Sequence, residues 1–152
     1  MGHASKIVRA LFLILVTLPF TELAVGAANS PTPEQQRWIN RANRHERAGW
    51  VFLRIQGGPR ERGFQHGYLM AKEIQWEIGA RKADWEHGSS MEWDWLVKEA
   101  ARFMTPKVDA ETLAEIDGMV EGMGVAGVRS SRDELVTYNG AIELASYWWP
   151  EN

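Results

Sequence analysis

Three histidines of this 152-residue sequence are the first candidates for metal chemistry. His45, His66 and His87 each have an acidic residue nearby, at Glu46, Glu73 and Glu86. Zinc sites are usually built on closely spaced ligands, such as two histidines four residues apart on a helix. Successive histidines here are 21 positions apart. We therefore expect histidines on the surface or on helix faces, and no metal or cofactor site.

A second group combines carboxylates with tryptophans between residues 84 and 95. Carboxylates beside aromatic rings can bind sugars, and two carboxylates at a fixed separation can hydrolyse a glycosidic bond. The sequence does not fix that separation, and an amphipathic helix with one solvated face has the same composition. We expect these residues to belong to an amphipathic helix with one solvated face, and a carbohydrate-binding surface is the alternative. The group comprises Asp84, Trp85, Glu86, Glu92, Trp93, Asp94 and Trp95.

The remaining motifs are weaker. Gly57-Gly58-Pro59-Arg60 follows a predicted strand, but it lacks the Lys-Ser/Thr of a phosphate-binding P-loop and the third glycine of a dinucleotide loop. We expect a turn with structural glycines. No Gly-x-Ser-x-Gly motif is present, and the chain contains no cysteine. The residues by themselves therefore predict architecture and no catalytic site.

The elements that would position these residues are mostly helices. Residues 50–55 alternate apolar and polar side chains and favour β-branched types, which predicts a strand. Apolar residues at helical spacing predict the helices, and Thr32, Asp109 and Ser131 are predicted N-caps, the last in a capping box with Glu134. The expected helices are 33–47, 60–85, 91–104, one beginning after Asp109 and one running from 132 to Trp149.

Two pairs of glycines lie four residues apart within these helices. Gly63 and Gly67 form one pair, and Gly118 and Gly122 form the other. Each glycine costs up to about 1 kcal/mol relative to alanine in a helix. Each pair lies on one helix face that lacks side chains. We therefore expect another backbone to pack closely against that face and so offset the cost of the glycines.

Residues 1–28 have the composition of a cleavable secretory signal. Lys6 and Arg9 precede an apolar run from Ala10 to Phe20, and small residues allow cleavage after Ala27 or Ala28. The run has 11 residues, whereas a membrane-spanning helix needs about 20. An uncleaved anchor and a buried helix are the other interpretations. The sequence thus predicts export to the periplasm or the medium, without a stable membrane span.

The rest of the chain is long enough for one domain with one core. Its formal charge is −4 once Lys6, Arg9 and Glu22 are removed, so it offers neither a nucleic-acid footprint nor a polybasic membrane patch. A single strand cannot satisfy its own hydrogen bonds, and Tyr147-Trp148-Trp149 places three aromatic residues near the end. Both features favour partner strands in sequence not present here.

Three segments, in order, resemble a known family. These are Gly57–Gly67 (GGPRERGFQHG), Glu115–Gly122 (EIDGMVEG) and Asp133–Gly140 (DELVTYNG) with Glu143-Leu144. They resemble the N-terminal segments of the penicillin acyltransferase-type Ntn hydrolases, which include acyl-CoA:6-aminopenicillanic acid acyltransferase-like and phospholipase B-like proteins. The Tyr147–Pro150 stretch is similar to that of the phospholipase B-like branches. The resemblance covers about residues 50–150.

The resemblance implies an autoproteolytic precursor that acts on amide or acyl-ester bonds. An internal cysteine becomes the N-terminal nucleophile of a second chain, and its free amino group can act as the base. The implied fold class is α+β, mostly helical, with one strand and four or five helices forming the N-terminal part of an αββα sandwich. The implied division is 1–28 signal peptide, 29–49 leader and short helix, and 50–152 the N-terminal, α-chain-like portion.

The cysteine would lie after the segment that matches Asp133–Trp149, and this chain has none. No catalytic residue is therefore carried over, and we expect this chain alone to be inactive. Its partners would be the C-terminal portion with the nucleophile and a small acyl or amide substrate. The alternative is an exported binding module that uses the Trp/Glu-rich surface for carbohydrate or envelope contact. Candidates for orienting or buried polar roles are Arg60, Glu61, His66, Asn139 and Glu143.

Overall fold

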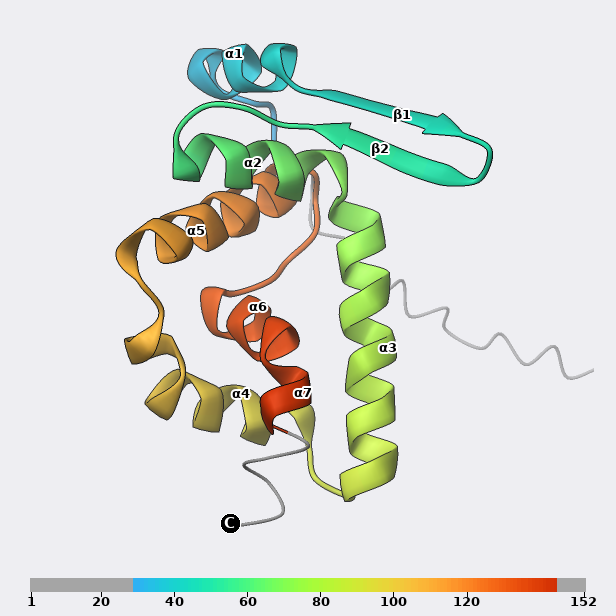
Figure 1. The fold of residues 1–152 in the computed structure, drawn as a ribbon, viewed down its shortest axis with the longest axis vertical. Coiled ribbons are helices and arrows are strands. Elements are labelled where there is room, and N and C mark those ends of the chain that lie inside the picture. The colour runs from blue at the N-terminus through green and yellow to red at the C-terminus, as the bar shows by residue number, and fades with distance from the viewer. Residues whose placement is uncertain (1–28, 145–152) are drawn as a thin grey trace, which may run out of the picture.

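The computed structural model describes residues 29–144 and is mostly helical, with one small sheet (Figure 1). This confirms the expected α+β class at that level. Within the described residues there are seven α-helices and two strands, more than the predicted four or five helices and one strand. The elements are α1 (Pro33–Arg41), β1 (Asn43–Arg47), β2 (Trp50–Arg54), α2 (Pro59–Leu69), α3 (Ala71–Ser89), α4 (Trp93–Phe103), the 3-10 helix η1 (Thr105–Lys107), α5 (Ala110–Val125), α6 (Arg132–Asn139) and α7 (Ala141–Glu143).

The predicted helix 33–47 was wrong in its second half. Helix α1 ends at Arg41, and Asn43–Arg47 pairs antiparallel with β2 as a hairpin. Ala48 and Gly49 form the turn with φ of 52° and 80°. Two consecutive positive φ values match the right-handed twist of a hairpin. The strand at 50–54 is therefore not alone, which removes one of the two reasons for expecting partner strands in further sequence.

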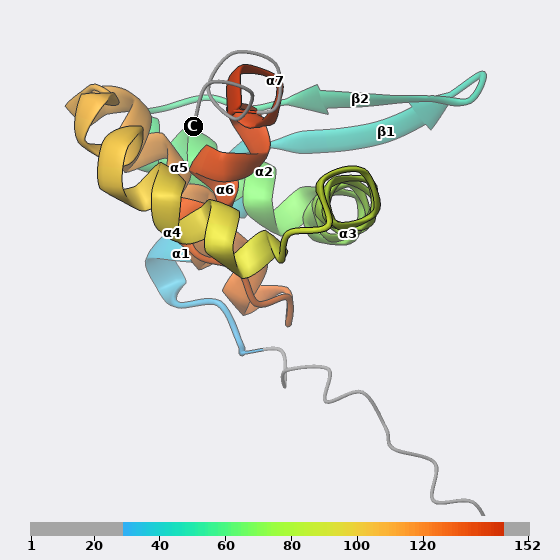
Figure 2. The same cartoon turned by 90° about the horizontal axis from the view of Figure 1, so that it is seen from below.

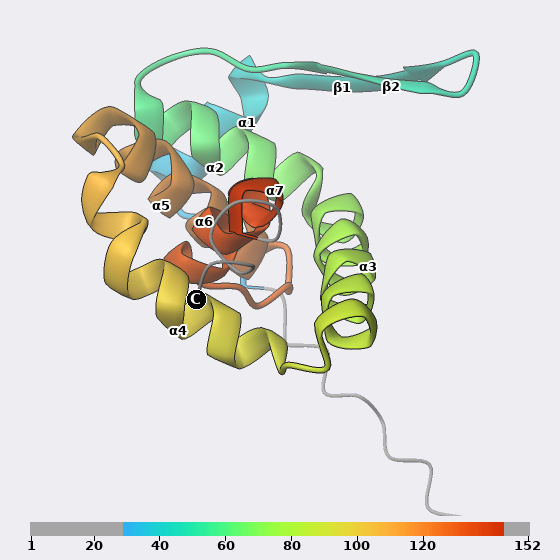
Figure 3. The same cartoon turned by 60° about the horizontal axis from the view of Figure 1, so that its bottom comes forward.

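The predicted helix 60–85 is divided in two. Met70 leaves the helical region, with φ of −120° and ψ of 17°, and α2 and α3 run in different directions from it (Figures 1 and 3). Helix α3 buries only Ala71, Ile78 and Trp85, which are seven residues apart. It therefore contacts the rest of the molecule along one narrow stripe, and its other faces are open to solvent.

Helices α2 and α5 lie side by side with their backbones in close contact, as the glycine spacing predicts. A β-carbon at Gly63 would overlap the carbonyl oxygen of Glu115, and one at Gly67 would overlap that of Met119. In return, β-carbons at Gly118 and Gly122 would overlap carbonyl oxygens of α2. Both glycine stripes thus face each other, and the expectation of close backbone approach is confirmed.

The predicted caps are largely confirmed. The Thr32 hydroxyl accepts from the backbone N–H of Gln35, whose side chain accepts from the Thr32 N–H in turn, with Pro33 as the first helical residue. Asp109 caps α5 through the backbone N–H of Thr112. Ser131 caps α6, but the Glu134 carboxylate accepts from the Ser130 hydroxyl instead of completing a capping box.

Helix α4 lies against α6, and side chains of α3, α4, α5 and α6 form one apolar core (Figure 2). Its largest fully buried apolar side chains, together with that of Phe64 on α2, are Trp93, Leu96, Met123, Leu135 and Leu144. Helix α6 ends at Asn139 and the short α7 follows Gly140, so the predicted single helix from 132 onward is interrupted. The signal segment 1–28 and the aromatic residues 147–149 lie outside the described residues. Among residues 29–144, no helix combines the length and the hydropathy that crossing a bilayer requires.

Candidate functional site

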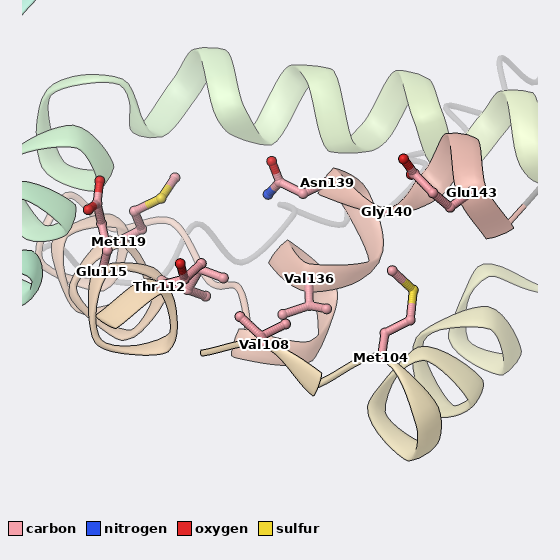
Figure 4. Close-up of a pocket in the computed structure, with 10 residues that line it drawn as sticks. Met104, Val108, Thr112, Glu115, Met119, Val136, Asn139, Gly140 and Glu143 are labelled. Carbon is pink, nitrogen blue, oxygen red and sulfur yellow. The ribbon is translucent and has the colours of Figure 1, made fainter. Parts of the chain in front are cut away.

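A cavity of about 560 Å³ opens between the end of α4, η1, α5, α6 and α7 (Figure 4). Its wall is mainly apolar, formed by Met104, Val108, Ile116, Met119 and Val136. Ile116 and Val136 are buried, whereas the polar lining residues stand nearer the solvent. Pockets of this size and composition accommodate a small ligand with an apolar body and a polar end. The polar lining residues are Thr112, Glu115, Asn139 and Glu143.

Two of the five residues singled out in the sequence line this cavity. Asn139, at the end of α6, and Glu143, on α7, are both exposed at its edge. Asn139 donates from Nδ2 to the Leu135 carbonyl oxygen at 2.8 Å, which leaves the orientation of its amide fixed by the helix. In Figure 4 the Asn139 side chain lies between Glu143 and the residues of α5.

Glu115 links the cavity to α2. Its Oε2 accepts from Nη2 of Arg62 at 2.9 Å, and the same hydrogen bond raises the pKa of Arg62. His66 lies on α2 as well, half-buried, and it does not line the cavity. Burial lowers the pKa of His66, while the charge of Glu115 acts in the opposite direction. The carboxylate of Glu115 is therefore held by α2 while it faces the cavity.

Arg60 and Glu61 lie away from the cavity. Nη2 of Arg60 lies 2.7 Å from Oε2 of Glu121, an ion pair on the exposed side of the α2–α5 interface. Glu61 pairs with Arg41 at the end of α1. These two candidates thus hold neighbouring elements together, and the structure does not bring them to the same place as Asn139 and Glu143.

A residue that the sequence did not single out, Gln65, is completely buried. Its Oε1 accepts from the backbone N–H of Gln56 at 2.9 Å, and its Nε2 donates to the carbonyls of Trp38 at 3.0 Å and Gln56 at 3.1 Å. One amide thereby satisfies backbone groups of α1 and of the β2–α2 loop, which are costly to leave unpaired when buried. In the sequence, only its position four residues after Glu61 could have indicated that Gln65 has a structural role.

The loop before α2 is a structural turn. Gly57 has a φ of 110°, and a β-carbon there would overlap the Glu61 carboxylate. Nη1 of Arg62 donates to the Gly57 carbonyl at 3.0 Å. A carboxylate from the helix itself therefore occupies the space beside the loop, where a phosphate-binding loop would leave room for its ligand.

The three histidines are on separate elements. His45 stacks on Phe52 in the hairpin with ring centroids 5.1 Å apart, His66 is on α2, and His87 is in the last turn of α3. Among residues 29–144, no three histidine or acidic side chains gather closely enough to hold a metal ion.

Two of the three tryptophans between residues 84 and 95 are buried. Trp85 and Trp93 are buried in the core, at 7% and 1% exposure, Trp95 is half-buried, and the carboxylates Asp84, Glu92 and Asp94 are exposed. The reason is the narrow contact of α3, for which Trp85 supplies one of three buried side chains. A sugar-stacking surface over residues 84–95 is therefore not supported.

Hydroxyl groups of the cavity are already engaged. The Thr112 Oγ1 donates to Oδ2 of Asp109 at 2.8 Å as part of the α5 cap, and the hydrogen bonds from Thr112 lower the pKa of Asp109, which makes this carboxylate a weak base. The arrangement can bind and orient a ligand, but none of its lining residues pairs a nucleophile with a base. Comparison of the chain with protein-family models, with curated proteins and with solved structures found no match to any of them.

Proposed function

We propose that this chain is the N-terminal, non-catalytic portion of an exported acyltransferase or amidohydrolase that acts on amide or acyl-ester bonds. A second polypeptide segment would carry the cysteine nucleophile. In this proposal the chain contributes a rigid helical scaffold and one wall of the substrate-binding site. Export rests on the composition of residues 1–28.

The observation that carries the proposal is the meeting of the three sequence segments on which the resemblance rests. The first supplies α2, the second supplies α5, and their glycines interlock. The third supplies α6 and α7, which close the cavity against α5. The first segment thus packs on the second, and the second and third line one cavity, as expected if these segments form a functional unit.

The chemistry of the cavity fits the proposed substrate class. Apolar side chains from α5, α6 and the region of η1 can surround an acyl chain, because burial of each methylene contributes about 0.8 kcal/mol. The amide of Asn139 and the carboxylates of Glu115 and Glu143 can pair with the N–H groups of an amide or amine. The bond to be cleaved would then lie at the exposed edge of the cavity.

In this proposal the nucleophile comes from the second polypeptide segment, since this chain has no cysteine. The first test is genetic. The DNA downstream of codon 152 and the neighbouring genes should contain a reading frame with a Cys-Ser or Cys-Thr start for the second segment. If no such frame exists in the genome, the proposal is wrong.

The second test is biochemical and uses N-octanoyl-glycine as the probe. The purified chain alone should show no hydrolysis of this amide but should bind it saturably by isothermal titration calorimetry. Val136→Trp, which fills the cavity, should remove binding, whereas Val97→Trp on the half-buried side of α4, outside the cavity, should keep it. Hydrolysis by this chain alone, or unchanged binding by Val136→Trp, would contradict the proposal.

A further inference from the structure

We infer that the β1–β2 hairpin is a peripheral membrane-binding element that docks on anionic phospholipid. The hairpin projects from the helical body, and its turn lies beyond α3 in all three views (Figures 1, 2 and 3). An isolated two-stranded hairpin is marginally stable in water, and three of its apolar side chains are exposed. These are Trp50 at 73%, Phe52 at 47% and Val51 at 38% exposure.

The pairing register divides the hairpin into two faces. Opposed residues share a face, so the pairs Asn43–Arg54, His45–Phe52 and Arg47–Trp50 form one face, here called the outer face. All six of its residues are exposed. The outer face thus combines two aromatic side chains with two arginines and contains no carboxylate.

The opposite face is the one that contacts the protein. Nη2 of Arg44 donates to Oε1 of Glu73 on α3 at 2.6 Å, and Leu53 beside it is half-buried. This ion pair also raises the pKa of Arg44. The hairpin is therefore fixed to α3 through one face, which leaves the outer face directed away from that contact.

The charges of the outer face select the partner. Neither Arg47 nor Arg54 makes an ion pair or side-chain hydrogen bond within the described residues, whereas the neighbouring arginines Arg41 and Arg44 are paired with Glu61 and Glu73. The chain as a whole has a formal charge of −3, whereas the outer face carries two arginines and no carboxylate, so this face is positive against the sign of the chain. Unpaired arginines attract the phosphates of an anionic leaflet.

The aromatic residues fit the same partner. Tryptophan favours the boundary between lipid headgroups and hydrocarbon, where its ring is buried and its N–H remains hydrated. Trp50 directly follows the turn, and Arg47 opposite it can extend its guanidinium to the headgroups. The hairpin would enter the interface at its turn, and binding would not require a membrane-spanning helix.

The test uses the absence of cysteine in the chain. Two labelled proteins are made, one with Ala48→Cys at the turn and one with Lys98→Cys on the exposed side of α4. In each, the single cysteine carries an environment-sensitive nitrobenzoxadiazole label. The labelled full-length chain is mixed with vesicles of phosphatidylcholine alone or with about one-third phosphatidylglycerol. Any binding by the apolar segment Ala10–Phe20 is common to both labelled proteins, so the difference between the labels reports on the hairpin.

We expect the label at position 48 to shift to shorter wavelength on the anionic vesicles, and the label at position 98 to stay unchanged. In the Ala48→Cys background, Trp50→Ala with Phe52→Ala should abolish the shift. Arg47→Gln with Arg54→Gln should weaken binding about tenfold or more, as expected for two basic residues near the surface. Trp76→Ala removes an equally exposed tryptophan from α3 and should change nothing.

Charge itself is controlled by Lys98→Gln with Lys107→Gln, which lowers the net charge equally on another surface. Circular dichroism checks that each variant keeps its helices. A silent label at position 48, an equal shift on pure phosphatidylcholine, or an equal effect of Trp76→Ala would each overturn the inference. A shift that appears without vesicles as protein concentration rises would overturn it as well, because the outer face would then bind a second copy of the chain.

Discussion

The carbonyl oxygen of Glu115 occupies the place that a β-carbon on Gly63 would need. Gly118 has the same relation to the carbonyl oxygen of Arg60 on the opposite helix. Because the obstructing atoms belong to backbone, neither overlap can be relieved by rotating a side chain. The α2–α5 contact is therefore the least tolerant part of the structure towards substitution.

Gly63→Ala and Gly118→Ala should each destabilise the protein by about 1–3 kcal/mol or more, the cost of forcing extra atoms into packed structure. Gly79→Ala is the matched control, since nothing lies within 4 Å of a β-carbon on that helical glycine. It should stabilise the protein by up to about 1 kcal/mol through helix propensity. Urea unfolding followed by circular dichroism measures all three, and equal effects of Gly63→Ala and Gly79→Ala would refute this packing.

Gln65→Leu should cost about 1–3 kcal/mol, because it removes partners from buried backbone groups of Trp38 and Gln56 while keeping the side-chain volume. Gln36→Leu changes an exposed glutamine on α1 whose side chain donates to Oδ1 of Asn40. Its effect should stay within about 0.5 kcal/mol. Thermal unfolding of both variants provides the comparison, and a small effect at Gln65 would mean that water can replace the amide.

His66 should make stability depend on pH. Burial lowers its pKa in the folded state below the unfolded value of 6.5, so the unfolded chain binds the proton more readily. The stability associated with the neutral imidazole is complete above pH 6.5 and is lost as the pH falls through the folded pKa. NMR titration of the imidazole measures this pKa directly. Glu115→Gln removes the opposing charge and should lower the pKa further, so a rise would contradict the assigned causes.

Ala48→Asn should strengthen the hairpin. Ala48 has a φ of 52°, a left-handed conformation that costs alanine about 1–2 kcal/mol and that asparagine adopts more readily before glycine. Amide hydrogen exchange in β1 and β2 should slow by up to about tenfold. Ala80→Asn on the exposed side of α3 should instead weaken its helix, and slower exchange in both variants would indicate a general effect of asparagine.

The glycine stripes and the caps could be predicted because each depends on local spacing. Glycines four apart share one helix face, and Thr32, Asp109 and Ser131 have side chains that reach their own helix N-terminus. The hairpin could not, because Asn43–Arg47 is polar throughout and its turn lacks the usual Asn-Gly. Trp85 and Trp93 belong to the segment expected to be an amphipathic helix face, and their burial at 7% and 1% agrees with that expectation, but the way α3 and α4 meet could not be predicted.

The candidate site was only partly predictable. Asn139 and Glu143 were identified because they lie in the third segment on which the resemblance rests, and both line the cavity. The apolar wall comes from α5 and the region of η1, which no local pattern brings next to α6. The interruption between α2 and α3 falls at Met70, where no glycine or proline indicates it in the sequence. It nevertheless directs α3 away from α2.

The glycine contact also determines the order in which the chain can fold. Gly63 meets a residue 52 positions later, so the glycine face of α2 has no partner until α5 has been synthesised, and α3 and α4 lie between them in the sequence. Such long-range closure is slow compared with helix formation. A newly made chain therefore leaves the glycine face of α2 uncovered until Gly122 is available, an interval in which the α2–α5 contact cannot form.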